Sequence, residues 1–333
     1  EKLSYEKIIK QVIQPKLTRF LKGRDVSGKK TQKKIALCID SFASSKGGAE
    51  RIAAEVANFL ANNGYQISML YRRGSPSYQT SETIKHLIYK EKTDITSLLA
   101  EEKVDALFCF IYNRDLVELC SCAAQLKIPF GYQECTNPTR LLTSNWKDPD
   151  GIVLSPEAAI AERHAVARYA SAIRLVMPSY KHSYPDQYQD KIFAFPNFAE
   201  ISTRPVKPFE LDCGRRYILC VNSMKANKNF IASLRAIFPL MRMHNLAIVD
   251  IGKAFKRDTP ARKEIDEFLE ANSIRDRVHW IGQVDDVSPY FAGAFCHMIA
   301  SRSEGCPTVV LEAMAHGTPT IGLQSTSGVS ELV

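Results

Sequence analysis

Short apolar runs rich in β-branched residues alternate, from residue 34 onward, with longer stretches in which apolar residues recur at helical spacing. This alternation is typical of βαβ units built around a mainly parallel sheet. The first half of the chain predicts strands at 35–40, 66–71, 105–110, 128–132 and 173–177, and helices that include 49–62, 114–125 and 156–169. We therefore expect one doubly wound α/β domain over residues 34–196.

The alternation resumes after a polar passage, 197–216, which contains Pro205 and Pro208 and is predicted to link two domains. Beyond it the pattern predicts strands at 217–221, 247–251, 277–281, 295–300 and 318–322, with helices at 227–243, 260–272, 288–292 and 308–316. A second doubly wound domain is therefore expected over residues 217–333. Two such domains in tandem predict a ligand cleft between the carboxyl ends of two parallel sheets.

Composition places the chain among soluble globular proteins. It has 333 residues, of which 45% are apolar and 24% charged, values that exclude disordered, collagenous and disulfide-stapled classes. The longest apolar run, 106–112, is far shorter than the roughly 20 residues that span a bilayer. Nine cysteines without a C-x-x-C pair favour reduced thiols in the cytosol, and for Cys120 and Cys122 helix packing is favoured over a metal or redox pair.

The positive charge is concentrated at the N-terminus. The net charge is +8, and residues 1–34 hold 11 Lys or Arg against 3 Asp or Glu, whereas the rest of the chain is balanced. Residues 1–33 form a basic amphipathic arm that suits an anionic membrane surface or, because the chain begins at Glu1, a solvated linker from a preceding domain. Both interpretations stay open. A nucleic-acid partner is not expected, since aromatic residues are not interleaved with the basic ones.

The segment 303–319 carries the most specific chemistry. Gly305 permits a tight turn after a predicted strand, and Pro307 suits the first position of a helix. The first N–H groups of that helix have no intrahelical acceptor, so they form a seat for an anion. Glu304 lies on the turn, and Glu312 lies in the otherwise apolar helix, where its carboxylate needs solvent or a hydrogen-bonding partner.

Two glutamates separated by seven residues, with these flanking residues, resemble the signature of retaining GT-B glycosyltransferases of family 4. The resemblance extends over about residues 34–333. It implies two Rossmann-like, doubly wound domains that face each other across a cleft, and a donor site in the C-terminal domain. It also implies that Glu304 contacts the donor sugar, that Glu312 binds the nucleotide ribose, and that 282–287, with Val284, lines the base. The remaining donor-binding residues are expected at the helix start: Gly305, Cys306, Pro307, Thr308 and Val309.

Further segments agree with this resemblance in order. Gly47 and Gly48 resemble the family's glycine-rich loop, which lets an acceptor or phosphate approach the backbone. Residues 195–197, Phe-Pro-Asn, resemble the element that ends its N-terminal domain. After the strand at 217–221 the family usually has an arginine and, five residues on, a lysine, both directed at the donor diphosphate. This chain keeps the lysine as Lys228 but has Ser223 in place of the arginine, and Lys225 is a candidate substitute.

The acceptor side is represented by Glu134. Many relatives place a histidine in this region, but residues 133–138 resemble a variant segment with an acidic residue near the acceptor. A surface carboxylate at a loop end is the alternative interpretation of Glu134. Arg163 and Arg168 are expected on a solvated helix face, and Asp148 and Asp150 are expected in a turn rather than at a metal.

These features predict a metal-independent, cofactor-free retaining glycosyltransferase. It would move a hexose or N-acetylhexosamine from a nucleotide-sugar, a UDP-sugar by family frequency, to a glycan or lipid-linked acceptor, as in surface polysaccharide assembly. Its expected location is the cytoplasm, peripheral to the inner face of the membrane if the arm binds there. The alternative is a catalytically silent sugar-nucleotide-binding or scaffold subunit, which the loss of the arginine favours. Because relatives usually continue beyond Val333, the C-terminal domain is expected to be truncated in this chain.

Overall fold

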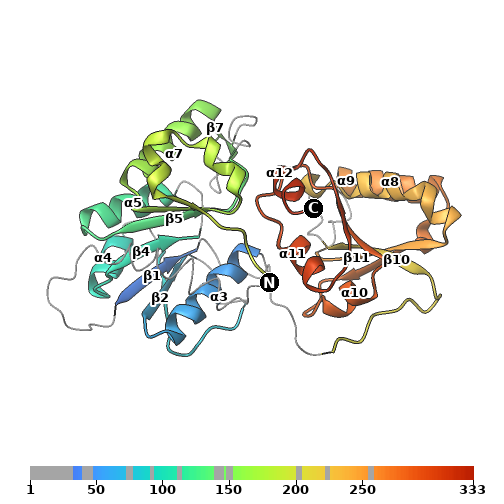
Figure 1. The fold of residues 1–333 in the computed structure, drawn as a ribbon, viewed down its shortest axis with the longest axis horizontal. Helices are drawn as coiled ribbons and strands as arrows, with labels where there is room; N and C mark the ends of the chain where they lie inside the picture. The colour runs from blue at the N-terminus through green and yellow to red at the C-terminus, as the bar shows by residue number, and fades with distance from the viewer. Residues whose placement is uncertain are drawn as a thin grey trace. The chain divides into compact units, whose positions relative to one another are not determined.

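The computed structural model describes residues 33–39, 48–72, 78–90, 94–110, 115–138, 146–147, 153–199, 205–221, 226–253 and 259–333. The chain divides into two compact units, which we call the N-unit and the C-unit, at the bond between Pro196 and Asn197. Each unit contains its own parallel sheet with helices beside it (Figure 1). Nearly all of the predicted basic arm lies outside the described residues, as do Asp148 and Asp150.

The sheet of the N-unit has seven strands in the order β3-β2-β1-β4-β5-β8-β9. All six neighbouring pairs are parallel. The central strands are apolar and buried, as expected for a parallel sheet covered on both faces. The strands are β1 (Lys34–Cys38), β2 (Gln66–Tyr71), β3 (Lys85–Ile88), β4 (Ala106–Cys109), β5 (Phe130–Glu134), β8 (Ala172–Leu175) and β9 (Ile192–Ala194).

Within the described residues of the N-unit, four α-helices and two 3₁₀ helices connect these strands. The start of α7 is fixed locally, because Ser155 accepts a hydrogen bond from the Ala158 N–H at 3.2 Å and Pro156 occupies the first turn. Two short strands, β6 (Trp146–Lys147) and β7 (Val153–Leu154), pair antiparallel outside the main sheet. The helices are α3 (Gly48–Asn62), α4 (Asp94–Glu101), α5 (Asp115–Gln125), α7 (Pro156–Tyr169), η3 (Pro178–Ser183) and η4 (Asp186–Lys191).

The sheet of the C-unit has five parallel strands in the order β12-β11-β10-β13-β14. One apolar cluster packs α8 and α9 on one face, and a second packs α10 and α11 on the other (Figure 1). The strands are β10 (Arg216–Val221), β11 (Leu246–Ile251), β12 (Val278–Gly282), β13 (Cys296–Ile299) and β14 (Thr320–Gly322). The helices are α8 (Phe230–Met243), α9 (Pro260–Ala271), α10 (Ser288–Gly293), α11 (Thr308–Ala315), α12 (Ser327–Ser330), η5 (Ala226–Lys228) and η6 (Arg275–Arg277).

The predicted helices and strands are all present, with ends shifted by a few residues. The largest shift is at α8, which begins at Phe230 rather than at residue 227. Asn229 has a φ of 52°, in the left-handed region, so the α-helix cannot extend through it and residues 226–228 form a 3₁₀ turn instead. The pattern did not indicate the strands β3, β6, β7 and β9, the helices α4 and α12, or the short 3₁₀ helices.

The second part of the predicted linker packs on the C-unit. The Phe209 N–H donates to the carbonyl of Pro289 at 2.9 Å, and the ring centroids of Phe209 and Tyr290 are 4.5 Å apart. Leu211 is buried in the same apolar cluster. Residues 205–216 therefore belong to the C-unit.

All nine cysteines lie within the described residues and all are free thiols. Seven are buried, among them Cys120 and Cys122 on α5. Helix packing, the favoured interpretation of that pair, is confirmed. Among the described residues no helix has the length and hydrophobicity that a bilayer crossing requires.

Acid should destabilise the C-unit through His297, which is fully buried on β13. Burial lowers the pKa of His297 to about 4, below its ordinary 6.5. The folded state holds this ring neutral while the unfolded chain protonates it, so its contribution is complete above about pH 6.5 and is lost towards pH 4. The loss should reach about 3 kcal/mol. Urea unfolding of His297→Gln should show a shallower pH dependence than wild type.

The exposed His244, at the end of α8, provides the control for this experiment. His244→Gln should keep the wild-type slope of unfolding free energy against pH. If His297→Gln also keeps it, burial of His297 does not set the acid sensitivity.

Candidate functional site

The turn 302–307 joins β13 to α11 and carries the first of the two predicted glutamates. Glu304 forms an ion pair with Lys228 of η5, with 2.5 Å between Nζ and Oε1. Their side chains are 12% and 24% exposed, so both charges are mostly withdrawn from water but still reachable from it. The structure thus brings together two predicted site residues that are 76 positions apart in the sequence.

The backbone of this turn is fixed from two other segments. Asn227 Nδ2 donates to the carbonyl of Ser303 at 2.9 Å, and the Arg302 N–H donates to the carbonyl of Asn227 at 2.9 Å. From α12, Gly328 approaches so closely that a Cβ there would lie 2.1 Å from the Gly305 oxygen. Any other residue at 328 would displace the turn, so the close approach explains the glycine.

The helix α11 begins directly after this turn. Pro307 stands before it, and no side chain caps its first turn. N–H groups at the start of a helix, together with the positive end of the helix dipole, attract anions, so this helix start is a candidate anion site. Gly305, Cys306 and Pro307 are buried, whereas the remaining predicted donor contacts are half-buried: Val284, Thr308, Val309 and Glu312.

Several predicted site residues lie elsewhere. Gly48 begins α3 in the N-unit and is half-buried. Gly47, Ser223 and Lys225 lie outside the described residues. Their roles therefore remain predictions.

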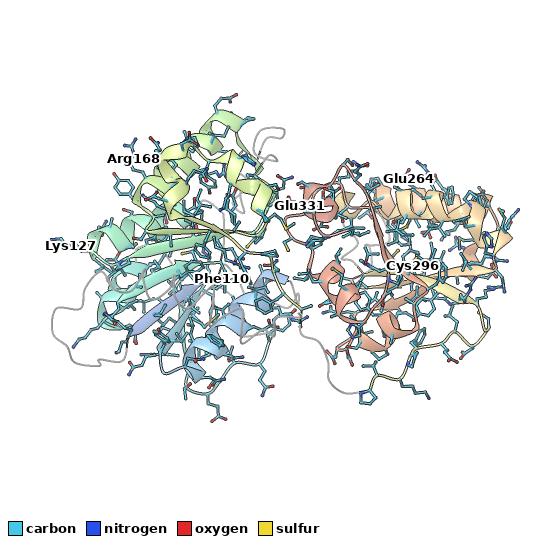
Figure 2. The ribbon with its side chains drawn as sticks, viewed as in Figure 1. Phe110, Lys127, Arg168, Glu264, Cys296 and Glu331 are labelled. Carbon is cyan, nitrogen blue, oxygen red and sulfur yellow. The ribbon has the colours of Figure 1, made fainter. Side chains whose placement is uncertain are left out.

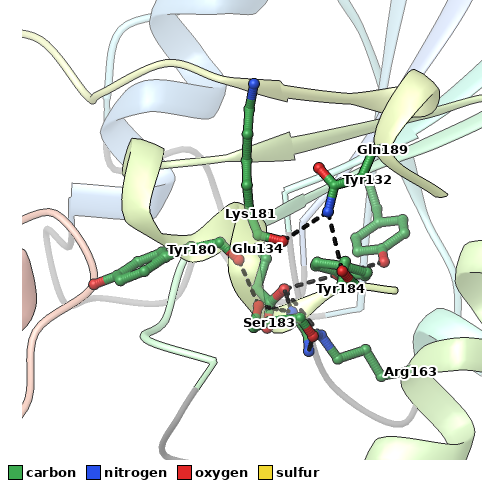
Figure 3. A network of polar contacts seen from close by, with 8 residues as sticks. All are labelled: Tyr132, Glu134, Arg163, Tyr180, Lys181, Ser183, Tyr184 and Gln189. Carbon is green, nitrogen blue, oxygen red and sulfur yellow. Dashed lines mark hydrogen bonds and ion pairs between the residues drawn. The ribbon is translucent and has the colours of Figure 1, made fainter. Parts of the chain in front are cut away.

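Glu134 lies at the carboxyl end of β5, where a buried polar cluster surrounds it (Figure 3). The Nε and Nη2 atoms of Arg163 both donate to Oε2 of Glu134, at 3.2 and 2.9 Å, and the Tyr184 hydroxyl donates to the same oxygen at 2.8 Å. The Arg163 guanidinium also lies 3.6 Å from the centroid of the Tyr184 ring. Glu134 is therefore held by protein groups on β5, α7 and the segment between η3 and η4.

The alternative interpretation of Glu134 and the expectation for Arg163 are wrong, whereas the predicted role of Glu134 near the acceptor stays a prediction. Glu134 is not a surface carboxylate, because it is 0% exposed, and Arg163 is not on a solvated face, because it is 3% exposed. Arg168, by contrast, is exposed as expected (Figure 2). The sequence contained a signal for Arg163: the buried residues Ala159, Val166 and Ala167 lie four before, three after and four after it, on one face of α7.

Burial and charge act against each other on this carboxyl group. Burial raises the pKa of Glu134, while the Arg163 charge and the Tyr184 hydroxyl lower it. The effect of burial is the larger, so the pKa of Glu134 lies above its ordinary value. Burial, and next the Glu134 charge, also raise the pKa of Tyr132 and Tyr184, whose hydroxyls are 2.6 Å apart. Arg163 also donates to the Ser183 carbonyl at 2.9 Å. The arrangement ties three elements of the N-unit together.

Known proteins resemble this chain in sequence and in fold. Residues 215–333 match the family model described as Glycosyl transferases group 1. An uncharacterized glycosyltransferase of Haemophilus influenzae is 26% identical over 317 residues, which are 90% of this chain and 83% of that protein. HepE from Anabaena, in complex with UDP and glucose, has a TM-score of 0.69 at 14% identity, covering 91% of this chain and 83% of that one. The fold is GT-B.

A second GT-B structure, the apo form of the lipopolysaccharide outer core galactosyltransferase WaaB, has a TM-score of 0.62 at 18% identity. The match covers 90% of this chain and 82% of that one. The fold predicted from the sequence is confirmed. The group 1 match covers the part of the C-unit that holds Lys228, Glu304 and Glu312. Within the described residues, no cluster of three His, Cys, Asp or Glu could hold a metal ion.

Removal of the Glu134 carboxylate should be costly. Glu134→Ala leaves the Arg163 charge buried without this partner, so the free energy of unfolding should fall by about 3–5 kcal/mol. Glu134→Gln, which keeps the shape and one acceptor, should cost less. Urea unfolding followed by circular dichroism measures both variants.

The exposed ion pair of Arg235 and Glu264 supplies the matched control. Its N–O distance is 3.0 Å and its side chains are 58% and 48% exposed. Glu264→Ala should therefore cost less than about 1 kcal/mol. Equal losses in Glu134→Ala and Glu264→Ala would contradict a structural role for the buried pair.

Proposed function

We propose that this protein is a retaining, metal-independent glycosyltransferase that takes a hexose or N-acetylhexosamine from a UDP-sugar. The observation that carries the proposal is the ion pair of Lys228 and Glu304 beside the start of α11, at 2.5 Å. A cation, a carboxylate and an open helix start in one place suit a ligand that has both phosphates and sugar hydroxyls. Nucleotide-sugars have both.

Lys228 and the helix start act on the leaving group. When the bond between the anomeric carbon and the diphosphate breaks, negative charge grows on the phosphate oxygens. Without a metal, this charge is stabilised by the lysine and by the N–H groups of Cys306, Thr308 and Val309. We propose that the Lys228 ammonium, which contacts Glu304 in the structure, moves onto the diphosphate when the donor binds.

The two glutamates orient the donor. Glu304 accepts hydrogen bonds from hydroxyls of the transferred sugar, and Glu312 accepts from the ribose. The acceptor oxygen then attacks the anomeric carbon on the same face that the diphosphate leaves. The C–O bond to the acceptor forms, the C–O bond to phosphate breaks, and a phosphate oxygen takes the acceptor proton. Domain closure that excludes water would favour transfer over hydrolysis.

The solved structures support the substrate classes. HepE is described in complex with UDP and glucose, and WaaB as a galactosyltransferase of the lipopolysaccharide outer core. We therefore propose UDP-hexose as the donor and a glycan or lipid-linked acceptor of surface polysaccharide assembly. A cytoplasmic location, with residues 1–34 on the inner face of the membrane, fits such an acceptor.

A silent sugar-nucleotide-binding subunit is the second candidate function. Ser223 stands where relatives carry a phosphate-binding arginine, so the site has one cation fewer. Loss of such a donor costs about 10²-fold or more in turnover elsewhere. Donor hydrolysis or transfer by the isolated chain would exclude this candidate.

A nucleotide screen tests the donor class directly. Thermal unfolding should be measured with UDP, GDP, ADP and their glucose conjugates in the absence of divalent metal. A ligand at 100 times its dissociation constant adds about 2.7 kcal/mol to stability. We expect the uridine compounds alone to raise the midpoint, and absence of any shift at millimolar concentration would contradict donor binding.

Substitution of site residues tests the assigned roles. Lys228→Ala should lower kcat about 10²-fold, because it removes charge stabilisation of the departing diphosphate. Glu312→Gln should raise the donor KM about tenfold with little change in kcat, because ribose binding is equal in ground and transition states. Initial rates at varied UDP-sugar concentration separate the two effects.

Lys263→Ala and Glu264→Gln, at exposed positions of α9, are matched controls of the same charge type. Both should keep wild-type kinetics. Wild-type kinetics in Lys228→Ala and Glu312→Gln as well would refute the site.

A further inference from the structure

Asn197, the first residue of the C-unit, makes two hydrogen bonds to Cys306, the residue that precedes Pro307. Its backbone N–H donates to Cys306 Sγ at 3.3 Å, and its Nδ2 donates to the Cys306 carbonyl at 3.0 Å. The two residues are 109 positions apart in the chain. Cys306 is 6% exposed, so both contacts lie in a protected environment.

The hydrogen bond to the Cys306 carbonyl matters because this carbonyl lies directly before the start of α11. Proline has no N–H, so the carbonyl of Cys306 is the only hydrogen-bonding group of the peptide unit between Cys306 and Pro307. A bond to that carbonyl fixes the plane of the peptide from which α11 starts. The direction of the first N–H groups of α11, which follow at Thr308 and Val309, depends on this plane.

The chain that delivers Asn197 is itself held in the N-unit. Arg174, 6% exposed on β8, donates through Nη2 to the carbonyls of Phe195 and Pro196, each at 3.0 Å. The Phe195 N–H donates to the Leu175 carbonyl at 2.9 Å. The segment that ends at Pro196 is therefore anchored to β8 within the N-unit.

A second asparagine acts in the same way on the other side of Glu304. Asn227 Nδ2 bonds the Ser303 carbonyl at 2.9 Å, while Asn197 Nδ2 bonds that of Cys306. Both anchors are neutral amides. They hold the backbone without placing a further charge beside the donor diphosphate. A negative side chain there would repel the diphosphate, and an additional positive side chain would bind it.

We propose that Asn197 is a positioning residue of the donor site: it fixes the turn 302–307 and thereby directs the N–H groups at the start of α11 towards the donor diphosphate. This proposal rests on the proposed function, because the ligand it serves is the UDP-sugar. Asn197 itself need not touch the donor.

The test compares Asn197→Ala and Asn197→Asp with wild type. Asp has the shape of Asn, but its carboxylate cannot donate to the Cys306 carbonyl, and it adds a negative charge near the phosphates. The matched control is Asn272→Ala, since Asn272 Nδ2 bonds the Phe268 carbonyl at 2.8 Å at the end of α9 in the same unit. UDP affinity is measured by calorimetry, and donor KM and kcat by initial rates.

We expect Asn197→Ala to raise the dissociation constant for UDP and the donor KM about fivefold, the effect of one neutral hydrogen bond. Asn197→Asp should raise them further, and Asn272→Ala should leave both unchanged. Without nucleotide, amide hydrogen exchange of residues 304–310 should be faster in both Asn197 variants than in wild type. It should be unchanged in Asn272→Ala. That readout does not depend on nucleotide binding.

The outcomes separate the two proposals. Wild-type UDP binding together with unchanged affinity and exchange in both Asn197 variants would overturn the positioning role and leave the proposed function intact. Equal loss of affinity in Asn272→Ala would show a general stability effect and would also overturn the role. A wild-type chain that binds no uridine nucleotide would overturn the proposed function, and the inference with it.

Discussion

The ion pair between Lys228 and Glu304 sets the chemistry of the C-unit. At 2.5 Å and with side chains 24% and 12% exposed, the two charges neutralise each other in a place where neither is fully hydrated. Such a pair costs less to open than a fully buried one, since water reaches both groups. In our proposal, the donor diphosphate at the start of α11 competes for the lysine, and the carboxylate then accepts hydrogen bonds from sugar hydroxyls.

The ion pair of Glu134 and Arg163 in the N-unit is, by contrast, almost completely buried. Its side chains are 0% and 3% exposed, and its carboxylate accepts from a tyrosine as well as from the guanidinium. Opening such a pair would strand a charge in a medium of low dielectric constant. The two ion pairs thus differ in burial, and the buried pair joins β5, α7 and the segment after η3.

Neutral hydrogen bonds complete the C-unit site. The carbonyls of Ser303 and Cys306 are bonded by asparagine amides, and Gly328 packs against the oxygen of Gly305. The two asparagines supply neutral donors, and Gly328 supplies space for the turn.

The sequence by itself determined the alternation of strands and helices, the two α/β units and the position of α11, because periodicity and turn chemistry act within about ten residues. The sequence did not predict the short edge strand β9, because three residues are too few to show a periodicity. It also did not predict the 3₁₀ helix η5, because the identity of Asn229 does not by itself indicate its left-handed backbone conformation. The resemblance of the segment that holds Glu304 and Glu312 to a glycosyltransferase signature indicated the candidate site. Only the tertiary structure decided that Glu304 pairs with Lys228, Cys306 with Asn197 and Glu134 with Arg163. Those pairs join residues between 29 and 109 positions apart, and which side chains meet depends on strand order, on the burial of each helix face and on the path of the turns between them.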